Sequence, residues 1–413
     1  MGIKGVSQMI LTAKQEEGLK IAVARYKAHE AYTCISGYAG TGKSTLIKFI
    51  IAALGLEPEQ VCYVAYTGKA AQVLKQKGCP NPYTAHKLLY KAKPMPNGTF
   101  KFEPKPALDE GLEVIIVDEV SMLPKEMWLR LLSHRIHVIA CGDPFQLPPI
   151  DKDSDNHVLD NPHIFLDEIM RQAYDSEIIR FSMWIREGKP INEFPASGQQ
   201  VMFVKPSQIV TGMYDWADQI LCATNAKRNA INMNMRQIKG FGPEPAVGDK
   251  IISLRNQWEF FSNGVVDPAP LTNGTIGVIQ RTDRYDMSLP FWISEKKIPI
   301  LYTNMVDENG DVFNYIPVDY TSLTTGEKFL TGKQEFQMRK NPRCPDPPFE
   351  FAYAYGITCH KAQGSEWGKV LVYEERFPFD KTEHARWAYT AATRASEKLV
   401  WVVDEETVLT QKV

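Results

Sequence analysis

Apolar and polar positions follow two different patterns along the chain, and the difference divides it into regions. Over residues 1–166, short apolar runs are separated by stretches with helical spacing. The runs lie at 33–36, 61–66, 114–117 and 137–141, and the helical stretches include 43–54 and 68–77. Strands that alternate with helices are typical of a parallel α/β sheet. The third run, residues 114–117, is β-branched throughout, as expected of a strand buried on both faces.

Two segments interrupt this alternation. Between residues 87 and 111, four prolines surround Asn97-Gly98, a dipeptide that favours a tight hairpin turn, so we expect a small hairpin excursion. From 246 to 345, three more Asn-Gly pairs accompany alternating apolar residues, which predicts a β-rich domain of the small SH3-like barrel type. Glycine- and proline-rich stretches at both ends indicate an insertion into a second α/β domain, formed by 167–245 and 346–413.

Composition narrows the class of protein. The 413 residues, of which 44% are hydrophobic and 23% charged, are typical of a globular protein of several domains. The net charge of −2 excludes a globally basic nucleic-acid-binding protein, so any phosphate contacts must come from locally placed cations. Seven scattered cysteines without a C-x-x-C pair argue against a metal site and favour a reduced compartment. Without a long apolar run or an apolar leader, we expect no membrane span and a cytoplasmic location, in bacteria or phage-infected cells.

A phosphate-binding loop is the strongest chemical signal. Residues 37–44, GYAGTGKS, fit the pattern G-x-x-x-x-G-K-[ST], follow a predicted strand and open a predicted helix. Glycines let backbone N–H groups surround phosphates, and the helix N-terminus favours their charge. We expect Lys43 to reach the β- and γ-phosphates and Ser44 to bind Mg²⁺. The predicted nucleotide-binding residues here are Gly37, Ala39, Gly40, Thr41, Gly42, Lys43, Ser44 and Thr45.

An acidic pair follows the buried run 114–117. Asp118 and Glu119 stand at the end of that predicted strand, downstream of the phosphate-binding loop. A carboxylate in this place can hold Mg²⁺, and a second one can polarise an attacking water. We therefore predict Asp118 as the metal ligand and Glu119 as the general base, the alternative being a solvated acidic strand end.

In this order the motifs resemble those of superfamily 1B DNA helicases of the RecD-like group, which includes the phage Dda helicase. The resemblance runs from Gln15 to Arg394 and so covers nearly the whole chain. It implies two RecA-like domains with ATP and Mg²⁺ between them, and a monomeric motor that moves 5′→3′ on single-stranded DNA. It also implies tailed or forked duplexes as substrates, and replication or recombination proteins as partners.

The resemblance assigns further residues to the nucleotide. Gln15 would read the adenine, Gln146 would report the γ-phosphate, and Arg171 and Arg394 would act as arginine fingers from the second domain. Gly364 and Glu366 would approach the nucleotide from the same side. One departure is Met170, which stands where many relatives place an aromatic residue that stacks on adenine. A thioether is a less directional contact, which leaves the choice of nucleoside triphosphate open.

The resemblance also assigns residues to the nucleic acid, and there alternatives remain open. The assigned residues are Thr67, Lys69, Thr84, His86, Thr224, Asn225, Thr358 and His360, together with Met95 and Phe100 on the hairpin as a strand-separating wedge. Thr84 and His86 are equally well explained as a helix cap, because threonine is a good N-cap residue. The hairpin is otherwise a solvent-exposed loop without a role.

Three other functions compete with an unwinding motor. The chain could be a translocase or remodelling ATPase that does not separate strands, a nucleic-acid-binding module with an inactive ATPase, or a motor on RNA. Phosphate contacts alone do not distinguish DNA from RNA. The intact Lys43, Asp118, Glu119 and Arg394 argue against the inactive ATPase.

Overall fold

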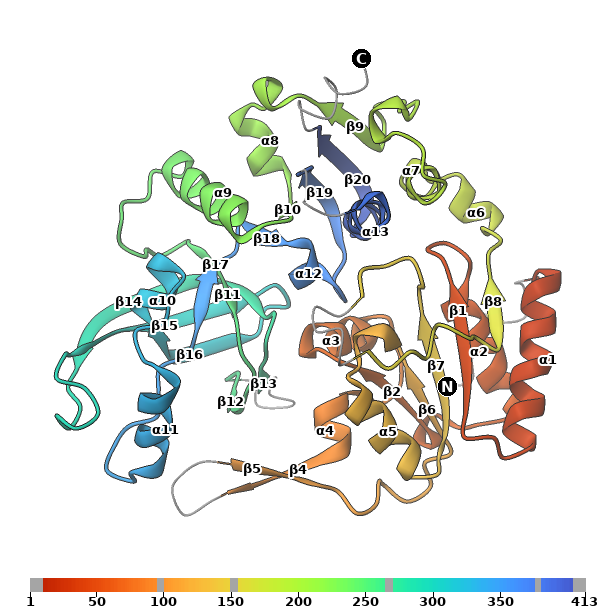
Figure 1. Cartoon of the computed structure of the whole chain (residues 1–413), viewed down its shortest axis with the longest axis horizontal. Coiled ribbons are helices and arrows are strands. Elements are labelled where there is room, and N and C mark those ends of the chain that lie inside the picture. Colours follow the sequence, from red (N-terminus) through yellow and green to blue (C-terminus); the bar gives the residue numbers. More distant parts are fainter. Residues whose placement is uncertain (1–9, 95–99, 149–154, 264–269, 376–379, 404–413) are drawn as a thin grey trace.

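The computed structural model describes residues 10–94, 100–148, 155–263, 270–375 and 380–403. These residues form two parallel sheets flanked by helices, with an antiparallel sheet beside the second one (Figure 1). The α/β class, predicted from the alternation, is confirmed, and so are the two RecA-like domains that the resemblance implies. None of the helices within the described residues has the length and apolar character that a membrane span requires.

The first sheet has six parallel strands in the order β3-β2-β6-β7-β1-β8. Its strands are β1 (Tyr32–Gly37), β2 (Val61–Ala65), β3 (Pro82–Thr84), β6 (Val114–Val117), β7 (His137–Gly142) and β8 (Ile164–Leu166). Its helices are α1 (Ala13–Lys27), α2 (Lys43–Leu54), α3 (Gly68–Gln76), α4 (Ala85–Leu89) and α5 (Lys125–Ser133). Strand β6 lies inside the sheet and is buried at all four residues, as its β-branched sequence predicts.

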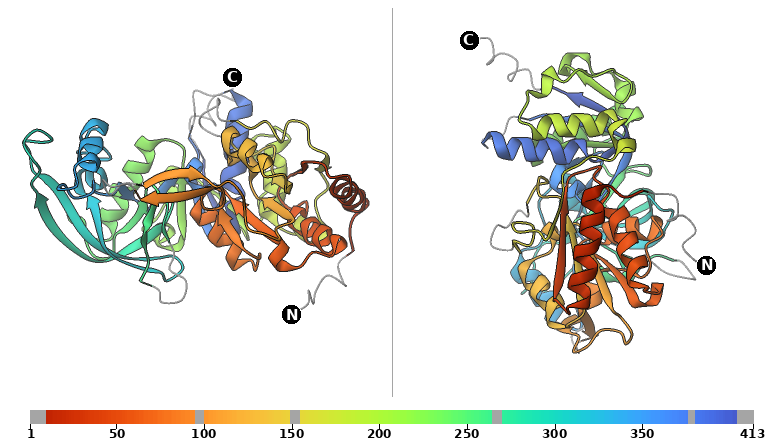
Figure 2. Two further views of the ribbon diagram at one scale, coloured as in Figure 1. Left: turned by 90° about the horizontal axis from the view of Figure 1, so that it is seen from below. Right: turned by 90° about the vertical axis from the view of Figure 1, so that its right-hand side faces the viewer.

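A two-stranded hairpin leaves this domain where the prolines predict it. Strands β4 (Tyr90–Pro94) and β5 (Phe100–Pro104) pair antiparallel from Tyr90↔Pro104 to Pro94↔Phe100. Met95 and Asn97-Gly98 lie outside the described residues. The excursion begins later than expected, because residues 87–89 belong to α4, which Thr84 caps by accepting a hydrogen bond from the Lys87 N–H. The hairpin extends towards the antiparallel sheet (Figure 2).

The second sheet has five parallel strands in the order β18-β10-β19-β20-β9. Its strands are β9 (Val201–Val204), β10 (Gln219–Cys222), β18 (Gly356–Thr358), β19 (Trp367–Tyr373) and β20 (Ala395–Val402). Its helices are α6 (Arg171–Tyr174), α7 (Glu177–Arg186), α8 (Thr211–Trp216), α9 (Asn225–Ile238), α12 (Cys359–Ala362) and α13 (Lys381–Ala392). The sequence is mostly apolar along β10, β19 and β20, in keeping with their burial in the middle of this sheet.

The inserted segment forms an antiparallel sheet in the order β16-β15-β14-β11-β17. Its strands are β11 (Lys250–Ser253), β14 (Ile276–Met287), β15 (Ile298–Asp307), β16 (Val312–Asp319) and β17 (Phe351–Tyr353), and β12 (Gln257–Phe261) pairs with β13 (Pro270–Leu271) beside them. Asn309-Gly310 joins the paired strands β15 and β16, whereas Asn273-Gly274 joins β13 to β14, which belong to different sheets; both glycines have positive φ. Gly264 of the third pair lies outside the described residues. Strand β17 belongs to this sheet although it lies beyond residue 345, where the inserted domain was expected to end.

Two helices within 246–345 contradict a domain made of strands alone. They are α10 (Tyr320–Thr325) and α11 (Gly332–Lys340). Asp319 caps α10 by accepting from the N–H groups of Thr321 and Ser322, and Thr331 forms a capping box with Gln334 at α11. Each of these cap signals consists of a few polar residues, and this region contains many other residues that favour turns. The sequence pattern therefore did not distinguish the two helices from turns. The SH3-like barrel stays a prediction.

The antiparallel sheet is joined firmly to the second domain. Its side chains share one apolar core with β10, β19 and β20 of the parallel sheet. Arg236 of α9 and Asp249, just before β11, form a buried ion pair with Nε 3.0 Å from Oδ1. The Tyr355 hydroxyl donates to the same carboxylate at 3.0 Å. Because an unpaired buried charge is costly, this pair fixes the inserted sheet to α9.

Candidate nucleotide site and nucleic-acid groove

The phosphate-binding loop lies between β1 and α2 of the first sheet. Gly40 and Gly42 have φ of +77° and +79°, a conformation that glycine adopts without strain. A Cβ added at Gly42 would lie 2.4 Å from the Gln15 amide nitrogen. The Lys43 ammonium donates to the carbonyl oxygens of Gly37 (2.6 Å) and Tyr38 (3.0 Å). Lys43, the predicted phosphate ligand, therefore contacts two carbonyl groups of its own loop.

Gln15 is buried against this loop. Its amide nitrogen donates to the Thr41 carbonyl at 3.2 Å, and its amide oxygen accepts from the Thr12 N–H at 3.0 Å in a capping box of α1. The side chain predicted to read adenine thus contacts the loop, with its donor and its acceptor both engaged by backbone groups.

The acidic pair follows strand β6 directly. Asp118 Oδ1 accepts from the N–H of Glu119, whose φ of +48° is unusual for a residue other than glycine. Glu119 Oε1 lies 3.6 Å from Nη1 of Arg394, and Oε2 is buried without a hydrogen-bond partner among the described residues. Burial raises the pKa of Glu119, while the Arg394 guanidinium acts in the opposite direction. A buried carboxylate oxygen with no partner is suited to bind a water or a proton.

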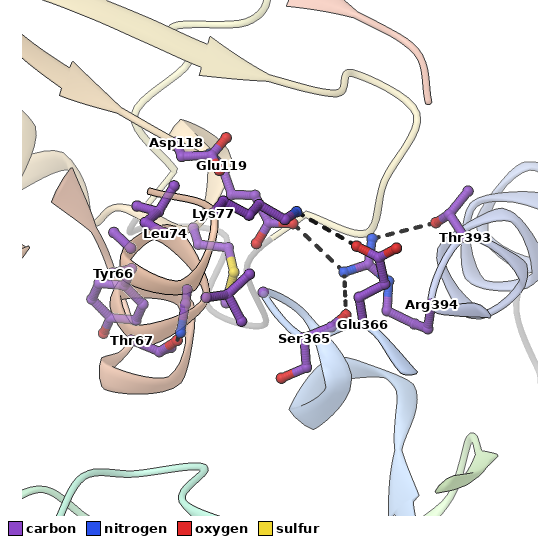
Figure 3. Close-up of a pocket in the computed structure, with 15 residues that line it drawn as sticks. Tyr66, Thr67, Leu74, Lys77, Asp118, Glu119, Ser365, Glu366, Thr393 and Arg394 are labelled. Atoms are coloured by element: carbon purple, nitrogen blue, oxygen red, sulfur yellow. Dashed lines mark hydrogen bonds and ion pairs between the residues drawn. The ribbon is translucent and has the colours of Figure 1, made fainter. Parts of the chain in front are cut away.

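Arg394 reaches Glu119 from the second domain (Figure 3). It follows helix α13 and is held by three contacts: Nε donates to the Thr390 carbonyl (3.1 Å), Nη1 to the Ser365 carbonyl (3.1 Å) and Nη2 to the Thr393 hydroxyl (3.3 Å). These bonds fix the guanidinium plane so that it faces the first domain. The geometry suits an arginine that meets developing charge only when the two domains are close.

A cavity of about 120 Å³ separates the two domains at this point. Asp118 and Glu119 line one side, and Gly364, Glu366 and Arg394 line the other. A Cβ at Gly364 would lie 3.3 Å from Glu119 Oε2 and 2.9 Å from the Ala70 Cβ, so only glycine permits this approach. Glu366 pairs with Lys77 across the cavity at 3.5 Å. Five sequence-predicted residues, three of them in the second domain, therefore meet at one cavity.

Two other predicted residues lie on loops that touch the phosphate-binding loop or the second domain. Gln146 lies on the loop after β7, where its N–H donates to the Asp143 carbonyl at 3.3 Å. Arg171 is the first residue of α6, and its side chain lies outside the described structure. The N–H of its neighbour Met170 donates to the Gly40 carbonyl at 3.0 Å, which places the start of α6 beside the loop.

A groove of about 480 Å³ runs between the two parallel sheets and the inserted sheet. Five residues predicted to bind nucleic acid line it: Thr67, Lys69, Asn225, Thr358 and His360. Sequence reasoning missed Arg228 and Asn273, which share the groove with Tyr66, Lys361 and Gln363. The Lys361 ammonium donates to Asn273 Oδ1 at 3.1 Å, which joins the second domain to the insertion. Burial and the Arg228 guanidinium lower the pKa of Lys361, as expected where cations are crowded together.

The other described side chains that were predicted to contact nucleic acid do not line this groove, and they form hydrogen bonds or ring contacts within the protein. Thr84 is buried as the cap of α4, and burial lowers the pKa of His86, whose ring lies between those of Tyr66 and Tyr90. Thr224 caps α9 and donates its hydroxyl to a Glu375 carboxylate oxygen at 2.6 Å. Phe100 begins β5, and its side chain, like Met95, lies outside the described structure.

Known proteins resemble the chain in both parallel domains. Residues 11–203 match a family described as an AAA domain, and 353–402 match a UvrD-like helicase C-terminal domain. The ATP-dependent RecD2 DNA helicase of Deinococcus radiodurans is 27% identical over 399 residues, which is 88% of this chain and 46% of that protein. Both parallel domains of the chain are thus similar to those of superfamily 1B helicases. The ATP-dependent DNA helicase dda of Enterobacteria phage T4 is 32% identical over 148 residues, or 34% of this chain and 33% of that protein.

Solved structures agree with the chain at the level of the fold. A Bacteroides Pif1 bound to single-stranded DNA has a TM-score of 0.52 at 18% identity and covers 98% of this chain and 97% of that one. A Bacteroides Pif1 complex with ADP-AlF3 and single-stranded DNA gives 0.51 at 17% identity over the same shares. The chain spans less than half the length of the two curated relatives.

Proposed function

We propose that this chain is an ATP-driven motor that moves along single-stranded DNA and unwinds tailed or forked duplexes. The observation that carries the proposal is the contact between Glu119 and Arg394, because it joins the acidic end of one parallel sheet to a cation of the other. A hydrolytic site completed by two domains makes turnover depend on their closure. The nucleic-acid groove runs between the same two domains, so closure and grip are linked.

In this mechanism Lys43 leaves its loop carbonyls to bind the β- and γ-phosphates, and Glu119 polarises the attacking water. Arg394 stabilises the negative charge that develops as the bond between the β- and γ-phosphates breaks. Arg171, at the start of α6, provides a second positive charge beside it. Ser44 and Asp118 are suitable ligands for Mg²⁺, which usually takes one or two protein oxygens beside phosphates and waters and would neutralise phosphate charge there. The described residues contain no cluster of three or more His, Cys, Asp or Glu side chains for a metal, in keeping with such a shared site.

Directional movement follows if ATP binds the closed arrangement more tightly than the open one. Each closure would draw the two walls of the groove together, and release of products would separate them. The likeness to superfamily 1B relatives favours 5′→3′ movement with the hairpin β4–β5 as the wedge. A monomer is sufficient for this cycle, because one chain contributes both walls and both halves of the nucleotide site.

The test is ATP hydrolysis and strand separation on four substrates: 5′-tailed and 3′-tailed duplexes, each in DNA and in RNA. We expect stimulated hydrolysis on the tailed DNA substrates and unwinding of the 5′-tailed DNA duplex. Stimulated hydrolysis without unwinding would make the chain a translocase, and preference for the RNA substrates would make it an RNA motor. Absence of stimulated hydrolysis on every substrate would refute the proposal.

A further inference from the structure

Tyr389 connects three parts of the nucleotide site that lie far apart in the sequence. It belongs to α13 of the second domain and is buried. Its hydroxyl accepts a hydrogen bond from the N–H of Ala39, in the phosphate-binding loop, at 2.8 Å. The same hydroxyl donates to Oδ2 of Asp143, after β7, at 2.6 Å. One hydroxyl group therefore joins the phosphate-binding loop, the Gln146 loop and the second domain.

The Asp143 carboxylate shapes the loop that carries Gln146. Its other oxygen, Oδ1, accepts from the Phe145 N–H at 3.0 Å, so the loop folds around the carboxylate. The Phe145 ring packs edge-on against the Tyr389 ring, with centroids 5.2 Å apart. Tyr389 thus contacts this loop through both its hydroxyl group and its ring.

Helix α13 and its surroundings hold the same loop on its far side. The Leu147 N–H donates to the Thr390 hydroxyl at 2.9 Å, and the Gln363 amide donates to the Leu147 carbonyl at 2.8 Å. Gln363 also lines the nucleic-acid groove. A displacement of the loop at Asp143 is therefore passed to a residue that lines the groove.

The N–H groups of a phosphate-binding loop are the groups that surround bound phosphates. Ala39 belongs to this loop, and its N–H is engaged by Tyr389. A γ-phosphate that draws this N–H towards itself weakens the bond to Tyr389, and loss of the phosphate restores it. The Tyr389 hydroxyl then shifts relative to Asp143, and α13 shifts relative to the loop.

We propose that Tyr389 is a positioning residue whose hydroxyl couples the nucleotide state of the phosphate-binding loop to the grip of the second domain on DNA. The proposal rests on the proposed function, since it requires both ATP and single-stranded DNA to bind. Coupling between two ligands is a ratio of affinities, and such ratios are typically about 5- to 150-fold. A residue that merely supports the fold changes stability without changing this ratio.

The experiment compares wild type with Tyr389→Phe, which keeps the ring against Phe145 and removes only the hydroxyl. The dissociation constant of fluorescein-labelled oligo(dT) is measured by anisotropy with saturating AMP-PNP and with saturating ADP. We expect the ratio of the two constants to fall at least threefold towards one in Tyr389→Phe. The matched control is Tyr355→Phe, which removes another buried Tyr–Asp hydrogen bond, at Asp249, away from the nucleotide. It should leave the ratio within twofold of wild type.

Each outcome decides the matter. An unchanged ratio in a folded Tyr389→Phe protein overturns the proposal and leaves the proposed function intact. If wild type binds oligo(dT) equally well with AMP-PNP and with ADP, and its ATP hydrolysis is not stimulated by DNA, both this proposal and the proposed function are overturned. If Tyr389→Phe does not fold, Asp143→Ala removes the acceptor of the same bond, and a ratio equal to that of wild type also overturns the proposal.

Discussion

At the residue scale, Lys43 shows how the phosphate-binding loop is held without phosphate charge. Its ammonium satisfies the carbonyl groups of Gly37 and Tyr38. A phosphate is a stronger partner than two carbonyl groups, because its hydrogen bonds to an ammonium are assisted by opposite charge. If Lys43 binds the phosphates as proposed, it exchanges these two carbonyl partners for phosphate oxygens when nucleotide binds.

Lys43→Ala is expected to abolish ATP hydrolysis stimulated by single-stranded DNA, with a loss of about 100-fold or more, because the cation that faces the phosphates is gone. Steady-state ATPase assays measure the loss, and a thermal melt shows that the variant is folded. The control is Lys48→Ala on the same helix. Stimulated turnover within tenfold of wild type would contradict the role of Lys43.

Arg394→Ala is expected to bind nucleotide nearly as wild type does and to lose hydrolysis by about 1,000-fold, because an arginine finger acts mainly in the transition state. Nucleotide affinity is measured by titration with a fluorescent ATP analogue, and turnover by single-turnover hydrolysis. A loss of affinity in proportion to the loss of rate would make Arg394 a ground-state binding residue.

The acid side of the pH–rate profile should depend on Glu119. Burial raises the pKa of its carboxyl group and Arg394 lowers it. A general base must be deprotonated, so turnover should fall as the pH drops through the pKa of Glu119. In Arg394→Gln the lowering influence is absent, so the acid limb of the residual activity should move to higher pH. Profiles of kcat at saturating ATP and oligo(dT) check this, and an acid limb at the same pH in both proteins would exclude Glu119 as the titrating group.

The nucleotide residues were predictable because most of them lie in contiguous motifs, whereas their partners were not. GYAGTGKS and the acidic pair after 114–117 identify themselves by local order. Tyr389 meets Ala39 across 350 positions and Thr390 meets Leu147 across 243, and no local pattern reports such pairs. Tyr389 could be placed on a helix from the sequence, but its partners Ala39 and Asp143 become evident only when the two domains pack together.

At the scale of elements, the strands and helices that alternate regularly were predicted, whereas two short helices that depend on their caps were not. Strand β6 and helix α2 begin and end where the sequence pattern places them. Helices α10 and α11 were missed because they are short and follow turn-rich sequence, and they depend on the caps Asp319 and Thr331. Strand β17 was missed because its partner β11 is distant in the sequence.

The hairpin β4–β5 is the element with the sharpest prediction. If it is the wedge, Met95→Ala with Phe100→Ala should lower duplex unwinding about tenfold, since stacking on an aromatic surface is worth about 1–3 kcal/mol per base. ATP hydrolysis on single-stranded DNA should stay within twofold of wild type. Strand-displacement and ATPase assays on the same preparation separate the two. Equal losses in both would mean that the hairpin supports the fold or the groove.

At the scale of the whole molecule, Glu308 holds the inserted sheet against both other domains. Its carboxylate pairs with Lys69 of α3 and accepts a hydrogen bond from the Trp367 indole at 3.2 Å. Although burial acts to raise it, the nearby Lys69 and Lys250 ammonium groups keep the pKa of Glu308 below its ordinary value. Gly68 beside Lys69 has no room for a side chain, because an added Cβ would lie 2.1 Å from the Thr272 hydroxyl oxygen. The groove is thereby enclosed on the side of the insertion.

Glu308→Gln should loosen this enclosure and speed the release of bound oligo(dT) severalfold, because the neutral amide loses its charge-assisted bond to Lys69. Stopped-flow dissociation against an unlabelled competitor strand measures the rate. Glu295→Gln, which changes an exposed carboxylate on the loop between β14 and β15, is the control and should leave the rate unchanged. Slower release in Glu308→Gln would mean instead that the freed Lys69 dominates by binding the strand.

The junction of the inserted sheet has a further consequence for how such chains diversify. Its outgoing strand β11 and its returning strand β17 are antiparallel neighbours, with Ser253 opposite Phe351. A segment that leaves and returns at one point can lengthen, shorten or be exchanged without shifting the strands of the parallel sheet that flanks it. Its shared apolar core demands only that a replacement cover the same apolar side chains. The groove wall that the inserted sheet forms can therefore be replaced, while the parallel sheet beside it keeps its strand register.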